Sequence, residues 1–508
     1  MAEKKLKDIL SYQHPDYISN INLWNLLADS RSGKGGFLPP LDEPKWGKVT
    51  PYWNTDIGPS YVIPFTREKQ NHYQQRVRST SYVNHFRRIE DTILGFMKRS
   101  PITIVDLPPE LEIWRQNADG LGHSLDDLIN GPIASDMLTY GYSFATADRP
   151  DIVVPNAAEA QKVMSYVNVR DIRSAIAWNT SEQTNQLEWI RFEEEFSRWL
   201  DPMAEPDIGT RWTIWTAEEV QCYEWIEFGP NKTKDAVMVQ GFPQPNPIKE
   251  LPLAIGYYSG IQSYFSIPES PLQSTALLGI YLFNRSSEET DLFRQRGYPL
   301  LAWPIKNGKK PAGLEGGNHT VIPFDSEGAA PQYLSPDGST AGGYDVLIKR
   351  GEAQIYEQSR TDFSRSGAQV ESGVSRAIRF QSMNSNLVSF GHALCDVARQ
   401  LCSLALKWNS PSPETMNVDD ILAETKFESP ANYDVKELDR ELAQMETGLT
   451  LKLGAIADAA IRKQARDLLV TLDPTQLEDS NKEIDGEAAV KRNAENAGEE
   501  QPPDEHLI

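Results

Sequence analysis

The chain has 508 residues, 39% of them hydrophobic, and a formal net charge of −22. This length is too great for a single hydrophobic core and predicts two to four domains. The acidic charge argues against a protein that grips nucleic acid over its whole surface, because such proteins are usually basic. We expect no transmembrane helix, because no run reaches about eighteen apolar residues, and no signal peptide, because no apolar segment follows the basic N-terminal residues.

The distribution of charge and of cysteines along the chain gives further information on the class of protein. Residues 67–99 carry eight basic residues against three acidic ones, and residues 473–508 carry eleven acidic residues against three basic ones. The plain interpretation of both segments is solvated surface. Cys222, Cys395 and Cys402 show no CxxC spacing, so we expect buried thiols in a protein of intracellular origin, with no disulfide framework and no zinc site.

The first half of the chain, residues 1–267, predicts mixed helices and strands. Residues 1–66 are rich in Pro, Gly and aromatic side chains and predict an extended arm with short helices. Residues 67–98 repeat apolar side chains at every third or fourth position, which predicts a helix. Ser124 is placed to cap another helix, which a strand follows. Residues 163–240 alternate polar and apolar side chains between turn residues, which predicts an antiparallel sheet.

The second half predicts long helices around a short β-rich segment. Ser270 is an N-cap for the first of these helices, and Gly297 followed by Pro299 marks its end. The helix that begins at residue 374 is the longest, at about 50 Å for a rise of 1.5 Å per residue. In chain order the predicted segments are a helix over 268–297, short strands and turns over 298–340, a helix over 341–362, a loop over 363–373, a long helix over 374–409, acidic helices over 410–478 and an acidic, disordered tail over 479–508.

Motifs for catalysis are not found. The stretch SRSGKGG lacks the features of a phosphate-binding loop, because Ala28 and Gly35 stand where Gly and Ser or Thr are required. The residues around Ser143 lack the second glycine of a nucleophile elbow. His72 and His85 are thirteen residues apart, too far for a metal pair on one helix. The chain is therefore expected not to be an enzyme and to bind no cofactor or metal, although catalytic residues dispersed in sequence stay possible.

Four stretches, in their order along the chain, carry a family resemblance. They are NHFRRIEDTILGFMKRSP, LINGPIASDMLTYGYSFATADRP, SPLQSTALLGIYLFNRSSEETDLFRQRGYPLLAWP and VESGVSRAIRFQSMNSNLVSFGHALCDVARQLCSLALKW. These stretches resemble the early helix, the following helix and strand, the stem helix running into the clip, and the tunnel loop with its long helix in the portal proteins of tailed bacteriophages. The resemblance covers residues 75–410 and rests on the order of the parts, not on an invariant signature.

The resemblance implies a portal-like α+β architecture, with an antiparallel-sheet and helix wing, a two-helix stem, a small β-rich clip, a long central helix and a helical crown. It implies a ring, usually of twelve subunits, at one vertex of the virion capsid, assembled in the host cytoplasm. The implied parts are an N-terminal arm and wing domain (1–267), a first stem helix (268–297), a clip (298–340), a second stem helix (341–362), a tunnel loop (363–373), a long wing helix (374–409) and a crown (410–478).

A portal ring is a conduit for double-stranded DNA during packaging and ejection, without sequence specificity. The resemblance therefore implies partners beside the DNA: the terminase large subunit, a head-to-tail adaptor, and the major capsid or scaffold protein, with no membrane. The composition fits this role, since a net negative channel repels phosphates while sparse basic residues position the duplex. Screening over about 8 Å confines such effects to near contact.

The predicted DNA-channel residues lie in and after the loop. Arg365 and Gln369 are expected near the DNA backbone, in a loop that Gly367 and Gly373 make pliable. Arg376 and Arg379, on the first turns of the next helix, could reach the same duplex or could pair with acids of a neighbouring subunit. The alternative for the loop is a plain connector between two helices.

The predicted partner-docking residues lie in the clip. Lys306, Lys309 and Lys310 fall in a Gly/Pro-rich segment that predicts an exposed turn, and the alternative is charge that serves solubility. Two other functions stay open for the whole chain: another virion structural protein, of the head-completion or scaffold-binding kind, or a cytoplasmic enzyme with a dispersed site. A ring with a central channel would separate the portal hypothesis from both.

Overall fold

A computed structural model of the chain describes part of the sequence. The chain divides into two compact units, Met1–Tyr433 and Asp434–Ile508. The described residues are 5–38, 60–150, 163–199, 201–260, 262, 264–297, 300–305, 321–325, 330–334, 339–361, 373–433, 459–463 and 480–489.

The N-terminal helices of the first unit are longer and better packed than an extended arm. The second of them runs for eighteen residues and buries Trp24 and Leu27 in the core. The His14 side chain caps its start by accepting the amide of Asp16, and Gly33, at φ 66°, ends it. The helices are α1 (Leu6–Leu10), α2 (Pro15–Ser32), α3 (Gln70–Ser79), α4 (His85–Arg99), α5 (Pro109–Arg115), α6 (Leu125–Leu128) and α7 (Ala134–Tyr140), with one π turn at Ile129–Ile133.

The predicted helix over 67–98 is two helices, α3 and α4. The break has a local cause, because the Asn84 side chain accepts the amide of Arg87 at 2.8 Å and caps α4. The apolar repeat belongs to α4, where Phe86, Ile89 and Ile93 are buried. The predicted cap at Ser124 is confirmed, since Ser124 and Asp127 form a reciprocal capping box.

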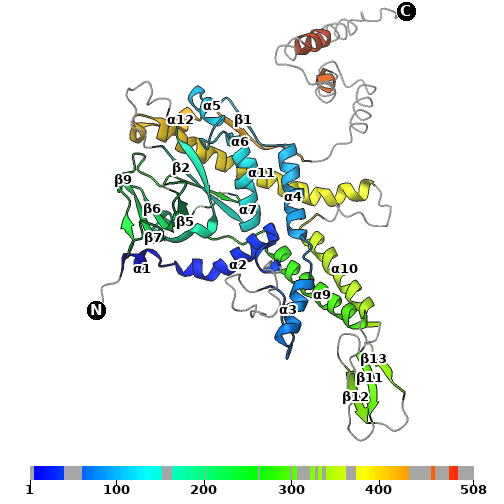
Figure 1. The fold of residues 1–508 in the computed structure, drawn as a ribbon. Coiled ribbons are helices and arrows are strands. Elements are labelled where there is room, and N and C mark those ends of the chain that lie inside the picture. Colours follow the sequence, from blue (N-terminus) through cyan, green and yellow to red (C-terminus); the bar gives the residue numbers. More distant parts are fainter. Residues whose placement is uncertain are drawn as a thin grey trace, which may run out of the picture. The chain divides into compact units, whose positions relative to one another are not determined.

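The predicted antiparallel sheet is confirmed, and the first unit contains a second, smaller antiparallel sheet as well (Figure 1). Six strands form the larger sheet in the order β4-β5-β6-β7-β8, with β9 paired to β7, and three form the smaller sheet in the order β10-β2-β3. Their bounds are β2 (Tyr142–Asp148), β3 (Tyr166–Arg170), β4 (Ala175–Thr180), β5 (Leu187–Arg198), β6 (Asp207–Thr216), β7 (Glu219–Phe228), β8 (Val237–Met238), β9 (Gln244–Pro245) and β10 (Leu253–Tyr257).

Helix α11 (Gly373–Asn409) is the long helix that the sequence predicts, and it begins one residue earlier than expected. Its apolar stripe from Leu387 to Trp408 is buried, and it packs on β2 and β10. A Cβ atom on Gly256 of β10 would lie 2.7 Å from Val397, so the strand and the helix approach closely there. The three cysteines are buried free thiols, as predicted.

Two long helices and a small sheet occupy the stretch between β10 and α11. They are α9 (Gln273–Gly297), β11 (Leu300–Ile305), β12 (Val321–Asp325), β13 (Gln332–Leu334) and α10 (Ser339–Gln358). Helix α9 starts after the predicted cap, because the Ser270 hydroxyl accepts the amide of Leu272 in a turn that precedes it. Helix α10 ends before residue 362, because Arg360 takes φ 56° and breaks the helical course.

The prediction of acidic helices from residue 410 is wrong for the stretch up to residue 433. After a short 3-10 turn (Pro413–Thr415) and α12 (Val418–Ile421), strand β14 (Lys426–Glu428) pairs antiparallel with β1 (Thr103–Val105). The stretch packs against the rest of the first unit. Tyr433 is buried there, and the Thr425 hydroxyl donates to the Asp106 carbonyl.

The second unit has two described stretches, residues 459–463 and 480–489, and both are helical. The tail from residue 479 was expected to be disordered, so its helical stretch differs from that expectation. Its acids have partners there, since Arg462 pairs with Glu487 and Lys463 with Asp485, each at 2.7 Å. The other residues from 434 onward, which belong to the predicted crown and tail, lie outside the described residues.

Candidate functional site

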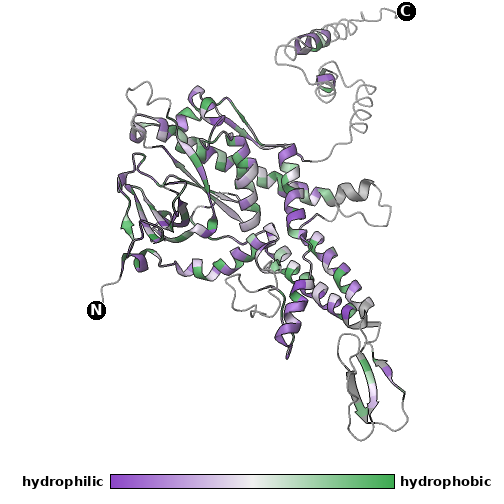
Figure 2. Ribbon diagram, viewed as in Figure 1, coloured by the Kyte–Doolittle hydropathy of each residue, from purple (hydrophilic) through white to green (hydrophobic). Residues whose placement is uncertain are grey.

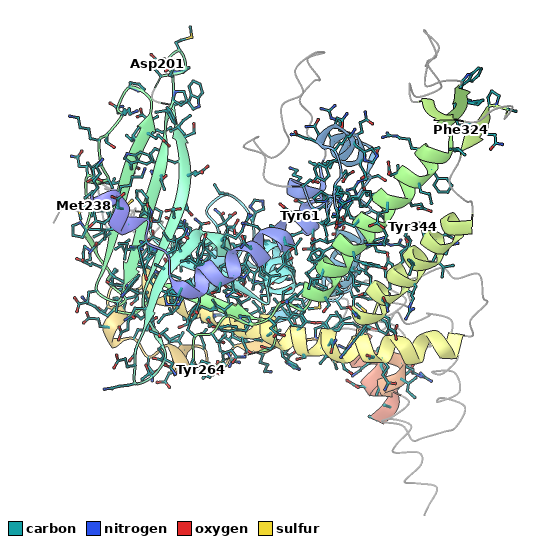
Figure 3. All side chains as sticks on the ribbon, turned by 90° about the horizontal axis from the view of Figure 1, so that it is seen from below. Tyr61, Asp201, Met238, Tyr264, Phe324 and Tyr344 are labelled. Carbon is teal, nitrogen blue, oxygen red and sulfur yellow. The ribbon has the colours of Figure 1, made fainter. Side chains whose placement is uncertain are left out.

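The two-helix hairpin of α9 and α10, together with the sheet at its end, is the feature that stands apart from the body of the first unit (Figure 1). The two helices pack against each other, and a Cβ atom on Gly351 would lie 2.6 Å from the Leu282 side chain. Figure 3 shows Tyr344 along α10 and Phe324 on the small sheet beyond it. The hairpin therefore carries its sheet away from the body.

The small sheet mixes both strand directions. Strand β11 pairs parallel with β12 and antiparallel with β13. The described part of β11 ends at Ile305, so the predicted docking residues Lys306, Lys309 and Lys310 lie outside the described residues. The prediction that they dock a partner stays a prediction.

The hairpin leaves large apolar side chains exposed along both of its helices. Figure 2 shows hydrophobic and hydrophilic residues interleaved along α9 and α10. Glycines at 342 and 343 of α10 have no neighbouring atom within 4 Å of a built Cβ. The exposed side chains, with their exposed fractions, are Leu277 (51%), Tyr281 (39%) and Phe293 (52%) on α9 and Val346 (64%) and Leu347 (40%) on α10.

The predicted DNA-channel residues are only partly described. Arg365 and Gln369 lie outside the described residues, between α10 and α11. The backbones of Arg376 and Arg379 lie in the first two turns of α11, and nothing is described of their side chains. The start of α11 extends beyond the sheets of the body (Figure 1). Helices α10 and α11 thus lie on either side of the predicted loop in the sequence, and the loop itself, up to residue 372, lies outside the described residues.

A buried ionic cluster fixes the hairpin to α3, and sequence reasoning missed it. Arg76 donates to Glu68 through Nε at 3.0 Å and Nη2 at 2.8 Å, and through Nη1 to the Ser287 hydroxyl of α9 at 3.0 Å. His72 lies between two carboxylates, 3.0 Å from Glu68 and 3.1 Å from Asp291 of α9. The spacing of four residues from Glu68 to His72 to Arg76 was the signal that could have found the α3 side of this cluster.

The charge of Glu68 follows from this environment. Burial alone would raise the pKa of Glu68, but the hydrogen bonds from Arg76 and from the Phe65 amide outweigh burial and lower that pKa. The carboxylate is therefore ionised at neutral pH, opposite a guanidinium that is equally buried. Such a pair holds two elements in one fixed geometry, because separating the charges would leave each of them buried alone.

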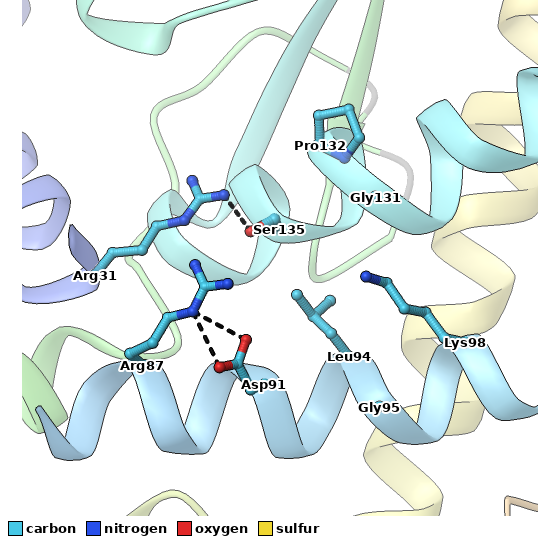
Figure 4. A pocket seen from close by; sticks show the side chains of 9 residues that line it. All are labelled: Arg31, Arg87, Asp91, Leu94, Gly95, Lys98, Gly131, Pro132 and Ser135. Carbon is cyan, nitrogen blue, oxygen red and sulfur yellow. Dashed lines mark hydrogen bonds and ion pairs between the residues drawn. The ribbon is translucent and has the colours of Figure 1, made fainter. Parts of the chain in front are cut away.

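A second polar cluster lies between α2, α4 and α7, beside a hollow of about 230 Å³ (Figure 4). Arg31 of α2 lies 3.1 Å from Glu90 of α4 and 2.9 Å from Asp136 of α7, and it donates to the Ser135 hydroxyl. Arg87 pairs with Asp91 at the rim, at 3.0 Å. Burial raises the pKa of Asp136 to about 6, an effect that the Arg31 charge opposes.

The two clusters have a structural role, because they hold separate helices together. Each joins helices that are distant in sequence, through an arginine whose donors face carboxylates. Within the described ranges, no group of three or more His, Cys, Asp or Glu side chains is arranged to hold a metal ion. Of the helices described here, none combines the length and the apolar character that crossing a bilayer requires.

Comparisons with known proteins give no family for the chain. No family model matches it. No curated protein is significantly similar to it in sequence.

Proposed function

We propose that this chain is a portal subunit that forms a ring at one vertex of a tailed-bacteriophage capsid. The observation that carries the proposal is the α9–α10 hairpin, which ends in a small sheet and leads into the longest helix, α11. The hairpin has apolar side chains that stay exposed in the described part of the chain. This order of parts also underlies the family resemblance of the sequence.

The exposed side chains support association of several copies. Apolar residues this exposed on both helices of a hairpin mark an interaction surface. Leu277 and Tyr281 lie one turn apart on α9, and Val346 and Leu347 lie on α10, so both helices contribute exposed apolar side chains. Contact between unlike surfaces of successive copies is head-to-tail and closes into a ring when the rotation between copies allows it.

The ring would serve as a conduit for double-stranded DNA. A net charge of −22 per chain disfavours tight, extended binding of phosphates. The connection between α10 and α11, with Arg365 and Gln369, would line the narrowest part of the channel, and Arg376 and Arg379 would follow it. Contacts with phosphates position a duplex without reading its sequence, which suits passage of any genome segment.

The outer end of the hairpin would bind the other proteins that act at the portal vertex. Lys306, Lys309 and Lys310 would contact the terminase large subunit during packaging and a head-to-tail adaptor afterwards. Capsid or scaffold protein would contact the ring at its vertex. The chain would then act as a virion structural protein and not as an enzyme.

Native mass spectrometry of the purified full chain, repeated over a range of salt concentrations, tests the proposal. We expect a single closed oligomer, close to twelve subunits. Only monomer at every salt concentration would contradict the ring. A closed oligomer without a central channel in images would favour a head-completion or scaffold-binding protein instead.

A further inference from the structure

Strand β10 lies at the edge of the smaller sheet, with one side paired to β2. The backbone groups of Ala254 and Gly256 face β2, as the flanking bonds at Pro252 and Tyr258 show. In an antiparallel pair, alternate residues point their N–H and C=O groups away from the partner strand. Leu253, Ile255 and Tyr257 therefore direct backbone groups toward the open side of β10.

A glutamine side chain occupies the centre of this open edge. The Ile255 amide donates to Oε1 of Gln400 at 3.1 Å, and Nε2 of Gln400 donates to the Ile255 carbonyl at 3.4 Å. A primary amide placed this way presents the same acceptor and donor that a neighbouring strand would present. Gln400, from α11, thus stands in for one residue of a further strand.

The groups on either side of Ile255 extend this pattern. The Leu253 amide bonds to the Leu251 carbonyl, and the Tyr257 carbonyl accepts from Gly260. The Leu253 carbonyl and the Tyr257 amide make no hydrogen bond to any residue in the described ranges. With Gln400 moved aside, the edge would offer an acceptor, a donor, an acceptor and a donor in the order that an extended peptide requires.

A hollow runs along this edge. Its volume is about 270 Å³, and Gln400 bounds it together with Leu187, Tyr264 and Phe265, none of which is charged. Tyr264 is half exposed and is labelled in Figure 3. The Phe265 amide donates to the Asn185 carbonyl at 3.0 Å, which fixes that wall beside the start of β5. Leu253, Ile255 and Tyr257 of the strand edge line this hollow, so their outward backbone groups face a space in which an extended peptide could lie.

We propose that the open edge of β10 binds an extended, uncharged segment of a partner protein by strand addition. In the absence of this segment, the Gln400 side chain occupies the Ile255 backbone groups that the segment would bind. Backbone hydrogen bonds to Ile255 would supply affinity, and the uncharged walls would select uncharged side chains at alternate positions of the peptide. Unpaired strand edges are templates for pairing with other chains, so a side chain that covers the edge also protects it from unwanted pairing. The proposal does not depend on the proposed portal function.

A displayed library of random eight-residue peptides, selected on the purified full-length protein, tests the proposal. We expect enrichment of peptides with uncharged residues at every second position. N-methylation of one peptide amide at a time should weaken binding about tenfold at alternate positions and leave the others nearly unchanged, because only alternate amides face the edge. Failure to enrich any binder, or a uniform response to N-methylation, would overturn the proposal.

Two variants separate this role of Gln400 from a purely structural one. Gln400→Ala frees the Ile255 backbone and should raise peptide affinity several-fold, while hydrogen exchange at residues 253–257 becomes faster without peptide and slower with it. Gln186→Ala is the matched control, since Gln186 lines the same hollow without bonding to β10, and should leave affinity within about twofold. Equal or weaker peptide binding by Gln400→Ala would contradict the place-holding role.

Discussion

Arg76 and Glu68 are joined by hydrogen bonds of 3.0 and 2.8 Å, and each side chain is only 1% exposed. Replacing Arg76 with Met should lower the free energy of unfolding of the first unit by about 3–5 kcal/mol, because it leaves the Glu68 carboxylate buried without its partner. Denaturant unfolding followed by tryptophan fluorescence measures this change.

Two variants control that measurement. Lys349→Met breaks an exposed pair between Lys349 and Asp345, whose side chains are 70% and 53% exposed, and should leave the free energy of unfolding nearly unchanged. Combining Arg76→Met with Glu68→Leu should recover part of the loss, because the uncompensated charge is removed as well. Equal effects of Arg76→Met and Lys349→Met would show that the buried pair does not stabilise the fold.

Asp136 should make stability depend on pH between about 4 and about 6. Its pKa is raised from 3.8 to about 6 by burial, so the folded state binds this proton more tightly than the unfolded state. The free energy of unfolding should therefore fall as pH rises through this window, by at most about 3 kcal/mol from this group. Above the window the contribution of this group is constant.

Comparison of the wild-type chain with Asp136→Asn isolates this contribution. The difference in free energy of unfolding between the two should change from pH 4 to pH 6 and stay constant above pH 7. Asp91→Asn, which removes an exposed carboxylate from the rim of the same hollow, controls for the loss of a negative charge. A difference that is flat over the whole range would show that Asp136 titrates alike in both states.

Val346→Glu should weaken association of the subunits while leaving each subunit folded. Val346 is 64% exposed on α10, so its own chain loses little, whereas a carboxylate in an interface between copies would be desolvated without a partner. Sedimentation velocity should show at least a tenfold weaker association. Leu121→Glu, at an 84% exposed residue between α5 and α6, should leave association unchanged, and equal behaviour of the two variants would exclude the Val346 side of α10 from the interface.

Deleting residues 364–372 should leave the oligomer assembled and impair DNA packaging or retention. The segment joins α10 to α11, and single substitutions such as Arg365→Ala should be tolerated, because no one residue holds the duplex. Particle assembly scored by microscopy and packaged DNA scored by nuclease protection measure the two effects separately. Normal packaging and retention by the deletion variant would make the segment a plain connector.

The helices and strands that the sequence predicts well are those with a strong local repeat. The stripe from Leu387 to Trp408 and the alternation over residues 163–240 each reflect burial of one face, so periodicity alone reveals them. The cap at Ser124 was equally visible, because the motif is confined to four residues. These elements make up much of the body of the first unit.

Contacts between distant residues were beyond the reach of this reasoning. Strand β14 carries only three residues and is defined by its pairing with β1, more than 300 residues earlier. The contact of Arg76 with Ser287 and the contact of Gln400 with Ile255 likewise join separate elements. Local spacing does not reveal such partners, although His72 and Arg76 lie one turn apart on α3 and Glu68 lies just before its start.

Negative-stain imaging of the purified full-length chain is the most direct test of the central claim. The portal account predicts ring-shaped particles with an open central channel, wide enough for a DNA duplex, in views along the ring axis. Particles that are uniformly monomeric, or closed assemblies without a channel, would contradict it.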